Sequence, residues 1–106
     1  MVLMNGGCFS TTAEFLSLAH ARKRATFIGE ESGGGYYGNT SGVVPALVLP
    51  NTKLVVYVPL VRYDLAVHGH QAASHGVLPD HAVRYTIEEL LQGTDKELAL
   101  ALELAK

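Results

Sequence analysis

Residues 2–15 read VLMNGGCFSTTAEF, and this stretch decides the fold class. Val2 to Met4 form a short apolar run that breaks at Asn5-Gly6-Gly7, a pattern typical of a buried strand followed by a turn. Thr11 and Glu14 have the spacing of a capping box, in which a hydroxyl and a carboxylate each satisfy a free backbone N–H of the first helical turn. We therefore expect a helix to follow the first strand directly.

A second strand should follow this helix. Arg22, Lys23 and Arg24 favour the helix end, because cations are stabilised at the negative pole of a helix dipole. The next residues, 25–28, read ATFI and predict a short strand. Strand, helix and strand in so short a stretch indicate a βαβ unit with a parallel sheet, and hence an α/β fold.

The middle of the chain predicts a loop and then a hairpin. Residues 29–42 read GEESGGGYYGNTSG, which is typical of a loop at a strand end. Residues 43–49 and 53–63 are rich in β-branched side chains, and Pro50-Asn51-Thr52 between them favours a tight turn. We expect these two segments to pair as a β-hairpin.

Two helices should close the chain after a histidine-rich irregular segment and a short strand around residues 82–85. Thr86 with Glu89 has capping-box spacing, and Gly93 is placed to end that helix. Thr94 with Glu97 repeats the same spacing for the last helix. The last helix is rich in leucine and alanine on more than one face, so we expect it to pack on a further structure.

The composition excludes several classes of protein. The chain has 106 residues, of which 48% are apolar and 17% charged, with a formal net charge of −2. This is one small domain at most, too apolar for disorder and too weakly basic for nucleic-acid binding. No run approaches the ~20 apolar residues of a membrane span, and no targeting segment is recognised. Because soluble domains carry about 25% charged residues, we expect some apolar surface to cover a neighbour.

Ser10 is the first candidate for chemistry. It follows the Gly6-Gly7 pair and directly precedes the expected helix, where a nucleophile is exposed and free N–H groups can stabilise an oxyanion. The alternative is that Ser10, Thr11 and Thr12 serve only as helix caps, for which serine and threonine are common. Cys8 is a second candidate nucleophile, although a lone cysteine at a strand end is more often a small buried residue.

The loop Gly33-Gly34-Gly35-Tyr36-Tyr37 is a candidate for binding a ligand. Glycines allow a backbone to approach a phosphate or a peptide closely, but this stretch lacks the lysine and the hydroxyl residue of a phosphate-binding loop. Tyrosines beside glycines suit a substrate groove better than a core. We interpret the loop as substrate-binding, with a flexible glycine loop of no specific function as the alternative.

The five histidines raise the question of a metal site. His68 and His70 would lie on the same side of an extended strand, and Asp64 or His75 is the nearest third ligand in sequence. The spacing matches no strong zinc signature, so solvated loop histidines are the preferred interpretation and no metal or other cofactor is expected. Any of these histidines is also a candidate general base for Ser10.

Four blocks of the sequence resemble, in the correct order, the C-terminal part of tail-specific (C-terminal processing) serine peptidases and of the tricorn protease core. The blocks cover nearly the whole chain: VLMNGGCFSTTAEF (2–15), RATFIGEESGG (24–34), GVLPD (76–80) and LLQGTDKELALAL (90–102). The resemblance implies a Clp-protease/crotonase-like core of which residues 1–106 form the C-terminal half.

The resemblance also implies roles for individual residues. Ser10 would be the nucleophile and the backbone N–H of Thr11 would contribute to the oxyanion hole, although strict counting from Glu14 would place Thr11 at the nucleophile position. Two departures from the family concern the catalytic base. Gly35 stands where the Ser-Lys members have a lysine, and Ala73 stands where tricorn-like members have an assisting glutamate.

These inferences predict a serine-type peptidase domain whose general base comes from an upstream segment, so that the 106 residues alone should be inactive. The alternative is a degenerate, non-catalytic module of the same fold that binds peptides or supports assembly. The expected partners are a peptide or protein substrate and the N-terminal half of the same domain, with a second copy of the chain as a further candidate. The sequence does not indicate a compartment.

Overall fold

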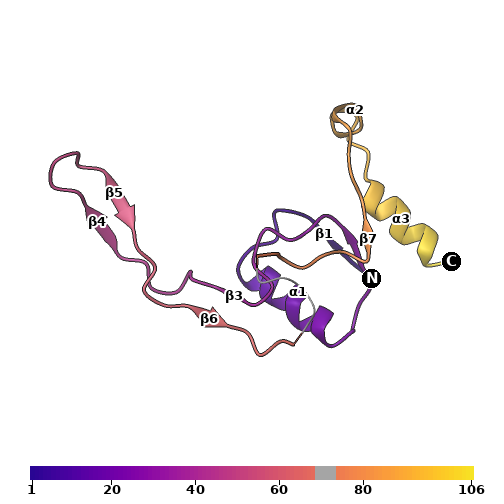
Figure 1. The fold of residues 1–106 in the computed structure, drawn as a ribbon. Coiled ribbons are helices and arrows are strands. Elements are labelled where there is room, and N and C mark those ends of the chain that lie inside the picture. Colours follow the sequence, from indigo (N-terminus) through magenta and orange to yellow (C-terminus); the bar gives the residue numbers. More distant parts are fainter. Residues whose placement is uncertain (69–73) are drawn as a thin grey trace.

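A computed structural model describes residues 1–68 and 74–106 as an α/β fold with three helices and three small sheets. Figure 1 shows three parts: a body built around α1 (Thr11–Ala21), a long two-stranded arm, and the C-terminal helices that follow β7 (His81–Ala82). No helix in these residues combines the length and the apolar character needed to cross a bilayer. The prediction of an α/β fold is thus confirmed.

The body contains a three-stranded parallel sheet in the order β1-β2-β7. Its strands are β1 (Val2–Met4), β2 (Phe27–Gly29) and β7 (His81–Ala82), and α1 connects the first two, so the predicted βαβ unit is confirmed. The second and third strands are displaced slightly from the expected residues 25–28 and 82–85. Gly29, at φ 133°, is required here because a Cβ atom would overlap the carbonyl oxygen of Met4 on the neighbouring strand.

The core lies where α1 packs on this sheet. Its buried members come from β1, α1, β2 and two later loops: Met4, Leu16, Phe27, Tyr36, Val67 and Val77. The backbone N–H of Phe27 donates to the Asp80 carboxylate at 2.8 Å, which fixes the segment leading into β7 beside β2. Burial of apolar side chains is the main stabilising contribution in such a small body.

The predicted hairpin is present, and it forms most of the arm in Figure 1. Strands β4 (Ala46–Val48) and β5 (Val55–Tyr57) pair antiparallel around a turn that contains Lys53 at φ 60°. A second antiparallel pair, β3 (Gly38–Asn39) with β6 (Tyr63–Asp64), joins the arm to the body. All residues of β4 and β5 are exposed, so the hairpin contributes no side chain to the core.

The two C-terminal helices form as predicted, but only one has the predicted cap. Thr86 and Glu89 form the complete capping box of α2 (Ile87–Leu91). The expected box of Thr94 with Glu97 is wrong, since α3 (Lys96–Leu104) begins one residue later and Asp95 is its N-cap, accepting from the N–H of Leu98 at 2.9 Å. A carboxylate is an equally good cap, and here it takes the role of the threonine hydroxyl.

Helix α3 leaves much of its apolar surface uncovered. It contacts β1 and β2, yet none of its residues is fully buried, and Leu98, Leu102 and Leu104 are exposed. The apolar faces anticipated for this helix are therefore open to solvent in this chain.

Candidate active site

Ser10 lies at the turn that connects β1 to α1, and its backbone adopts an unusual conformation. The turn is closed by the Cys8 N–H, which donates to the Asn5 carbonyl at 3.0 Å. Ser10 follows at φ 52° and ψ −130°, as the N-cap of α1, and its exposed side chain forms no capping hydrogen bond. A non-glycine residue held at positive φ costs of order 1–3 kcal/mol, and such strain concentrates at functional sites.

The predicted capping box at Thr11 and Glu14 is therefore wrong. Helix α1 starts one residue earlier than that box requires, so Glu14 stands four residues after the N-cap rather than three, and its carboxylate accepts from the Asn39 side-chain amide at 2.7 Å instead. The interpretation of Ser10 as a helix cap also lacks its defining bond within the described residues. The hydroxyl of Ser10 remains available for other interactions.

The backbone N–H of Thr11 is also available in the described part of the chain. The neighbouring amide of Thr12 donates to the Phe9 carbonyl at 3.1 Å and that of Glu14 to the Ser10 carbonyl at 3.0 Å, but Thr11 has no acceptor there. As the first residue of α1, Thr11 stands at the positive pole of the helix dipole. Its N–H is thus suited to an anionic oxygen beside Ser10.

Ser10 and the three glycines Gly33, Gly34 and Gly35 line one cavity of about 510 Å³. The Gly34 N–H donates to the Cys8 carbonyl at 3.0 Å, which ties this glycine loop to the turn before α1. A Cβ atom on Gly33 would lie 2.3 Å from the Phe9 ring, and one on Gly34 would lie 2.5 Å from the Ala13 side chain. The glycines are therefore needed for the close approach of the loop to the turn.

The same cavity has further lining residues that the sequence reasoning did not single out. They come from the turn before α1, from β3, from the residues just after it and from the two ends of the arm: Phe9, Gly38, Asn39, Thr40, Ser41, Val44 and Pro59. The polar run Asn39-Thr40-Ser41 within the glycine-rich stretch is the signal that could have identified them. These residues give the cavity hydrogen-bonding groups opposite an otherwise apolar wall.

Tyr36 corrects the interpretation of the loop's aromatic residues. It is 0% exposed and belongs to the core, where its hydroxyl lies 3.2 Å from Nδ1 of His20 on α1. This burial raises the pKa of Tyr36. Tyr37 packs edge-on against Tyr36 and is partly buried against the same core. The expectation of an exposed aromatic groove is thus wrong for Tyr36, because α1 supplies a histidine that satisfies its hydroxyl.

A general base for Ser10 is absent from the cavity wall in the described residues, since the wall contains no histidine, lysine or carboxylate side chain. Gly35, which the resemblance aligns with the lysine of the Ser-Lys peptidases, lies in this wall. Ala73, which it aligns with the assisting glutamate of tricorn-like peptidases, falls outside the described residues. The histidine candidates are either engaged elsewhere or exposed: His20 with Tyr36, His75 with Glu31, and His68 and His81 at the surface.

His75 and Glu31 form an ordered pair that the sequence did not reveal, because 44 residues separate them. Nδ1 of His75 lies 3.0 Å from Oε1 of Glu31, and the same oxygen accepts from the Gly76 N–H at 2.8 Å. The hydrogen bond from the Gly76 backbone, together with that from the His75 side chain, lowers the pKa of Glu31. The hydrogen bonds of Glu31 with His75 and Gly76 thus connect the start of the glycine-rich stretch to the segment before β7.

The metal interpretation finds no support in the described residues, where no group of three or more potential ligands is clustered. His70, and with it the proposed pair with His68, lies outside those residues. Of the two suggested third ligands, Asp64 accepts from the Arg62 side chain at 2.7 Å and His75 is paired with Glu31.

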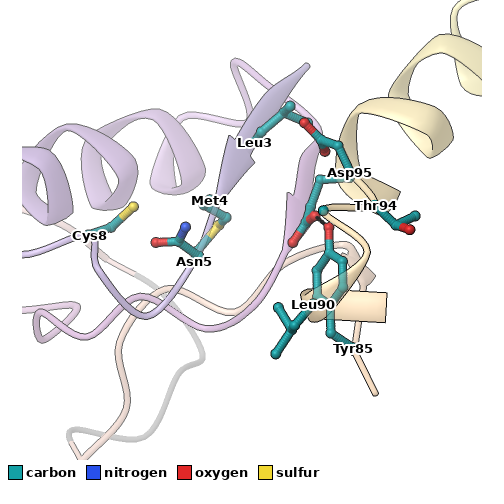
Figure 2. Close-up of a pocket in the computed structure, with 10 residues that line it drawn as sticks. Leu3, Met4, Asn5, Cys8, Tyr85, Leu90, Thr94 and Asp95 are labelled. Carbon is teal, nitrogen blue, oxygen red and sulfur yellow. Dashed lines mark hydrogen bonds between the residues drawn. The ribbon is translucent and has the colours of Figure 1, made fainter. Parts of the chain in front are cut away.

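A second cavity, of about 470 Å³, lies between the end of β1 and the start of α3. Figure 2 shows Leu3, Met4, Asn5 and Cys8 on one side of it and Tyr85, Leu90, Thr94 and Asp95 on the other. The Tyr85 hydroxyl donates to the Glu97 carboxylate, and this bond raises the pKa of Tyr85. Cys8 thus lines a different cavity from Ser10, and it is partly buried against the core.

The sequence matches no protein-family model, and no curated protein matches it. A functional assignment therefore depends on the motif blocks of the sequence and on the geometry around Ser10.

Proposed function

We propose that this chain is the C-terminal part of a serine-type peptidase domain with Ser10 as its nucleophile. One observation carries the proposal: Ser10 is held in a strained, uncapped conformation between a strand and a helix, at the wall of a cavity lined by glycines. This is the arrangement that exposes a serine oxygen beside the free N–H groups of a helix N-terminus. The order of the four sequence blocks supports the same assignment.

In the proposed reaction, Ser10 Oγ attacks the carbonyl carbon of a peptide bond and transfers its proton to a general base. The developing oxyanion accepts a hydrogen bond from the Thr11 N–H at the positive end of α1. The proton then passes from the base to the leaving amine as the C–N bond breaks. Water, activated by the same base, hydrolyses the acyl-enzyme and regenerates Ser10.

The substrate would lie along the Gly33–Gly35 loop, because this loop and Ser10 share one cavity. The absence of side chains there allows a peptide backbone to approach the protein backbone closely. The base, and the second oxyanion donor, would come from an upstream segment of a Clp-protease/crotonase-like domain. The parallel strands and connecting helix described above are compatible with that fold.

A non-catalytic, peptide-binding module of the same fold is the second candidate. The specific observation in its favour is that no basic or acidic side chain among the described residues reaches the Ser10 cavity. In that case the strained Ser10 would have no catalytic partner in any longer form of the protein.

A fluorophosphonate probe, which reacts only with an activated serine, distinguishes the two candidates. We expect no labelling of the 106-residue chain, and labelling of Ser10 in a protein that also carries the upstream sequence. Ser10→Ala should abolish that label, whereas Thr11→Ala should retain it, because only the Thr11 backbone is required. The measurement is peptide mass spectrometry of the labelled protein. An active preparation that is not labelled, or is labelled on Thr11, would overturn the assignment.

Stability measurements test the strain at Ser10 independently of activity. Glycine tolerates positive φ, so Ser10→Gly is expected to raise the free energy of unfolding of the 106-residue chain by about 1 kcal/mol. If Ser10 acted as a cap, the same change would cost a few tenths of a kcal/mol. Thr12→Gly, within α1, is the matched control and should lower stability by about 0.3–0.5 kcal/mol, because threonine is already less favourable than alanine in a helix. Chemical denaturation followed by circular dichroism gives both values.

A further inference from the structure

The arm, residues 43–60, carries an apolar surface that no other described part of the chain covers. All three residues of β5 are exposed, and because successive strand residues point to opposite faces, neither face of the hairpin is packed. Tyr57 is 68% exposed and Leu54 64%. A two-stranded hairpin is marginally stable in water by itself, so an uncovered one of this length needs a partner.

The two faces of the arm differ in their surroundings. Directly opposite residues share a face, and the register Leu47↔Val56 therefore defines one face and Val48↔Val55 the other. The Val48 face continues at its base to Val44 and Pro59, which line the Ser10 cavity. The Leu47 face has no such connection, and its exposed residues are Val43, Leu47, Leu54, Val56, Val58 and Leu60. We call it the outer face.

The surface area available suits a protein partner of ordinary size. The chain exposes 7471 Å², whereas a compact monomer of its mass would expose roughly 5,700 Å². The radius of gyration is 17.4 Å, against about 13 Å for a compact domain of this length. The excess of surface, to which the extended arm and the C-terminal helices both contribute, is larger than the ~800 Å² that each partner contributes to a standard interface.

The charge on the arm favours a second copy of the same chain as that partner. Lys53, in the turn, is the only charged residue between positions 43 and 60, so two outer faces can approach each other without repulsion or loss of charge solvation. A two-fold contact places the same patch on both sides, which requires a surface complementary to itself. A flat, neutral face of aliphatic side chains meets that requirement.

From these observations we propose that the outer faces of two arms pack against each other in a symmetric homodimer. The two hairpins would stack as two layers about 10 Å apart, with Leu47 and Val56 at the centre of the contact. The arrangement leaves the Val48 face, and with it the entrance to the Ser10 cavity, on the outside. This proposal does not depend on Ser10 being a nucleophile.

Sedimentation velocity of the 106-residue chain across a dilution series tests the proposal. We expect a concentration-dependent dimer for the unmodified chain. The double substitution Leu47→Lys with Val56→Lys should weaken the association at least about 100-fold, because charge is introduced into the centre of the apolar contact. The matched control, Val48→Lys with Val55→Lys, places the same charges on the same strands but on the other face, and should still dimerise.

Circular dichroism of each variant shows that the body remains folded. A monomer at all concentrations would overturn the proposal, as would loss of the dimer in both double variants. Binding of a monomeric chain to phosphatidylcholine vesicles would assign the outer face to lipid instead. A longer protein that carries upstream sequence and stays monomeric, while the 106-residue chain dimerises, would assign the face to that upstream segment.

Discussion

Gly29→Ala is expected to unfold most of the molecule. A Cβ atom at this position would lie 1.9 Å from the Met4 carbonyl oxygen, and the φ of 133° is one that alanine rarely adopts. Neither partner can move away, because Met4 O accepts from the Glu30 N–H at 3.0 Å and Gly29 O from the Val83 N–H at 2.9 Å. The loss should exceed about 4 kcal/mol, a large fraction of the stability of a small domain.

Gly6→Ala is the control for this prediction, since a Cβ atom there would meet nothing within 4 Å. We expect it to change the free energy of unfolding by less than about 0.5 kcal/mol. Far-ultraviolet circular dichroism and urea denaturation give the comparison. Equal midpoints for Gly29→Ala and the unmodified chain would contradict the close approach of β1 and β2.

Phe27→Ala should produce the second-largest loss, of about 3–5 kcal/mol. The Phe27 ring is 1% exposed at the centre of the core, and His20 packs against it with ring centroids 5.7 Å apart. Its removal leaves a cavity between the sheet and α1 that neighbouring side chains can fill only in part. The free energy of unfolding from urea titration measures the effect, with the denaturant slope as a check that the folded state is retained.

Phe15→Ala is the matched control because it removes the same ring from an exposed position on α1, where Phe15 is 56% exposed. We expect a change of no more than about 0.5 kcal/mol. Similar losses in the two variants would show that the core is not where the sheet and α1 place it.

The elements that local sequence specifies were predicted well. Apolar runs next to glycine or basic residues indicated β1 and β2, and the hairpin followed from β-branched runs around Pro50-Asn51-Thr52. Helix α1 forms although the capping box that predicted it does not. The capping box at Thr86 and Glu89 formed because both partners lie within one helical turn. The contacts that stabilise the hairpin and this cap join residues that are close in the chain, so the local pattern carries most of the information about them.

The site could be predicted only in part, because its geometry depends on contacts between distant residues. Serine and threonine are similar as N-cap residues, and the local pattern predicted that Thr11 would be the N-cap of α1. In the structure the N-cap is Ser10, in the turn on which Gly34 packs. Burial of Tyr36 likewise depends on His20 from another element. A single sequence contains no local signal for such pairs.

The central position of β2 imposes an order of assembly on the newly made chain. β1, α1 and β2 can pair as soon as they are synthesised, but the Phe27 N–H reaches its Asp80 partner across 53 residues. At synthesis rates of about 5–20 residues per second, that partner arrives about 3–10 s later. During this interval one edge of β2 is unpaired, and once residue 60 has been made the apolar hairpin is exposed as well, so the nascent chain offers strand edges with which other chains can pair.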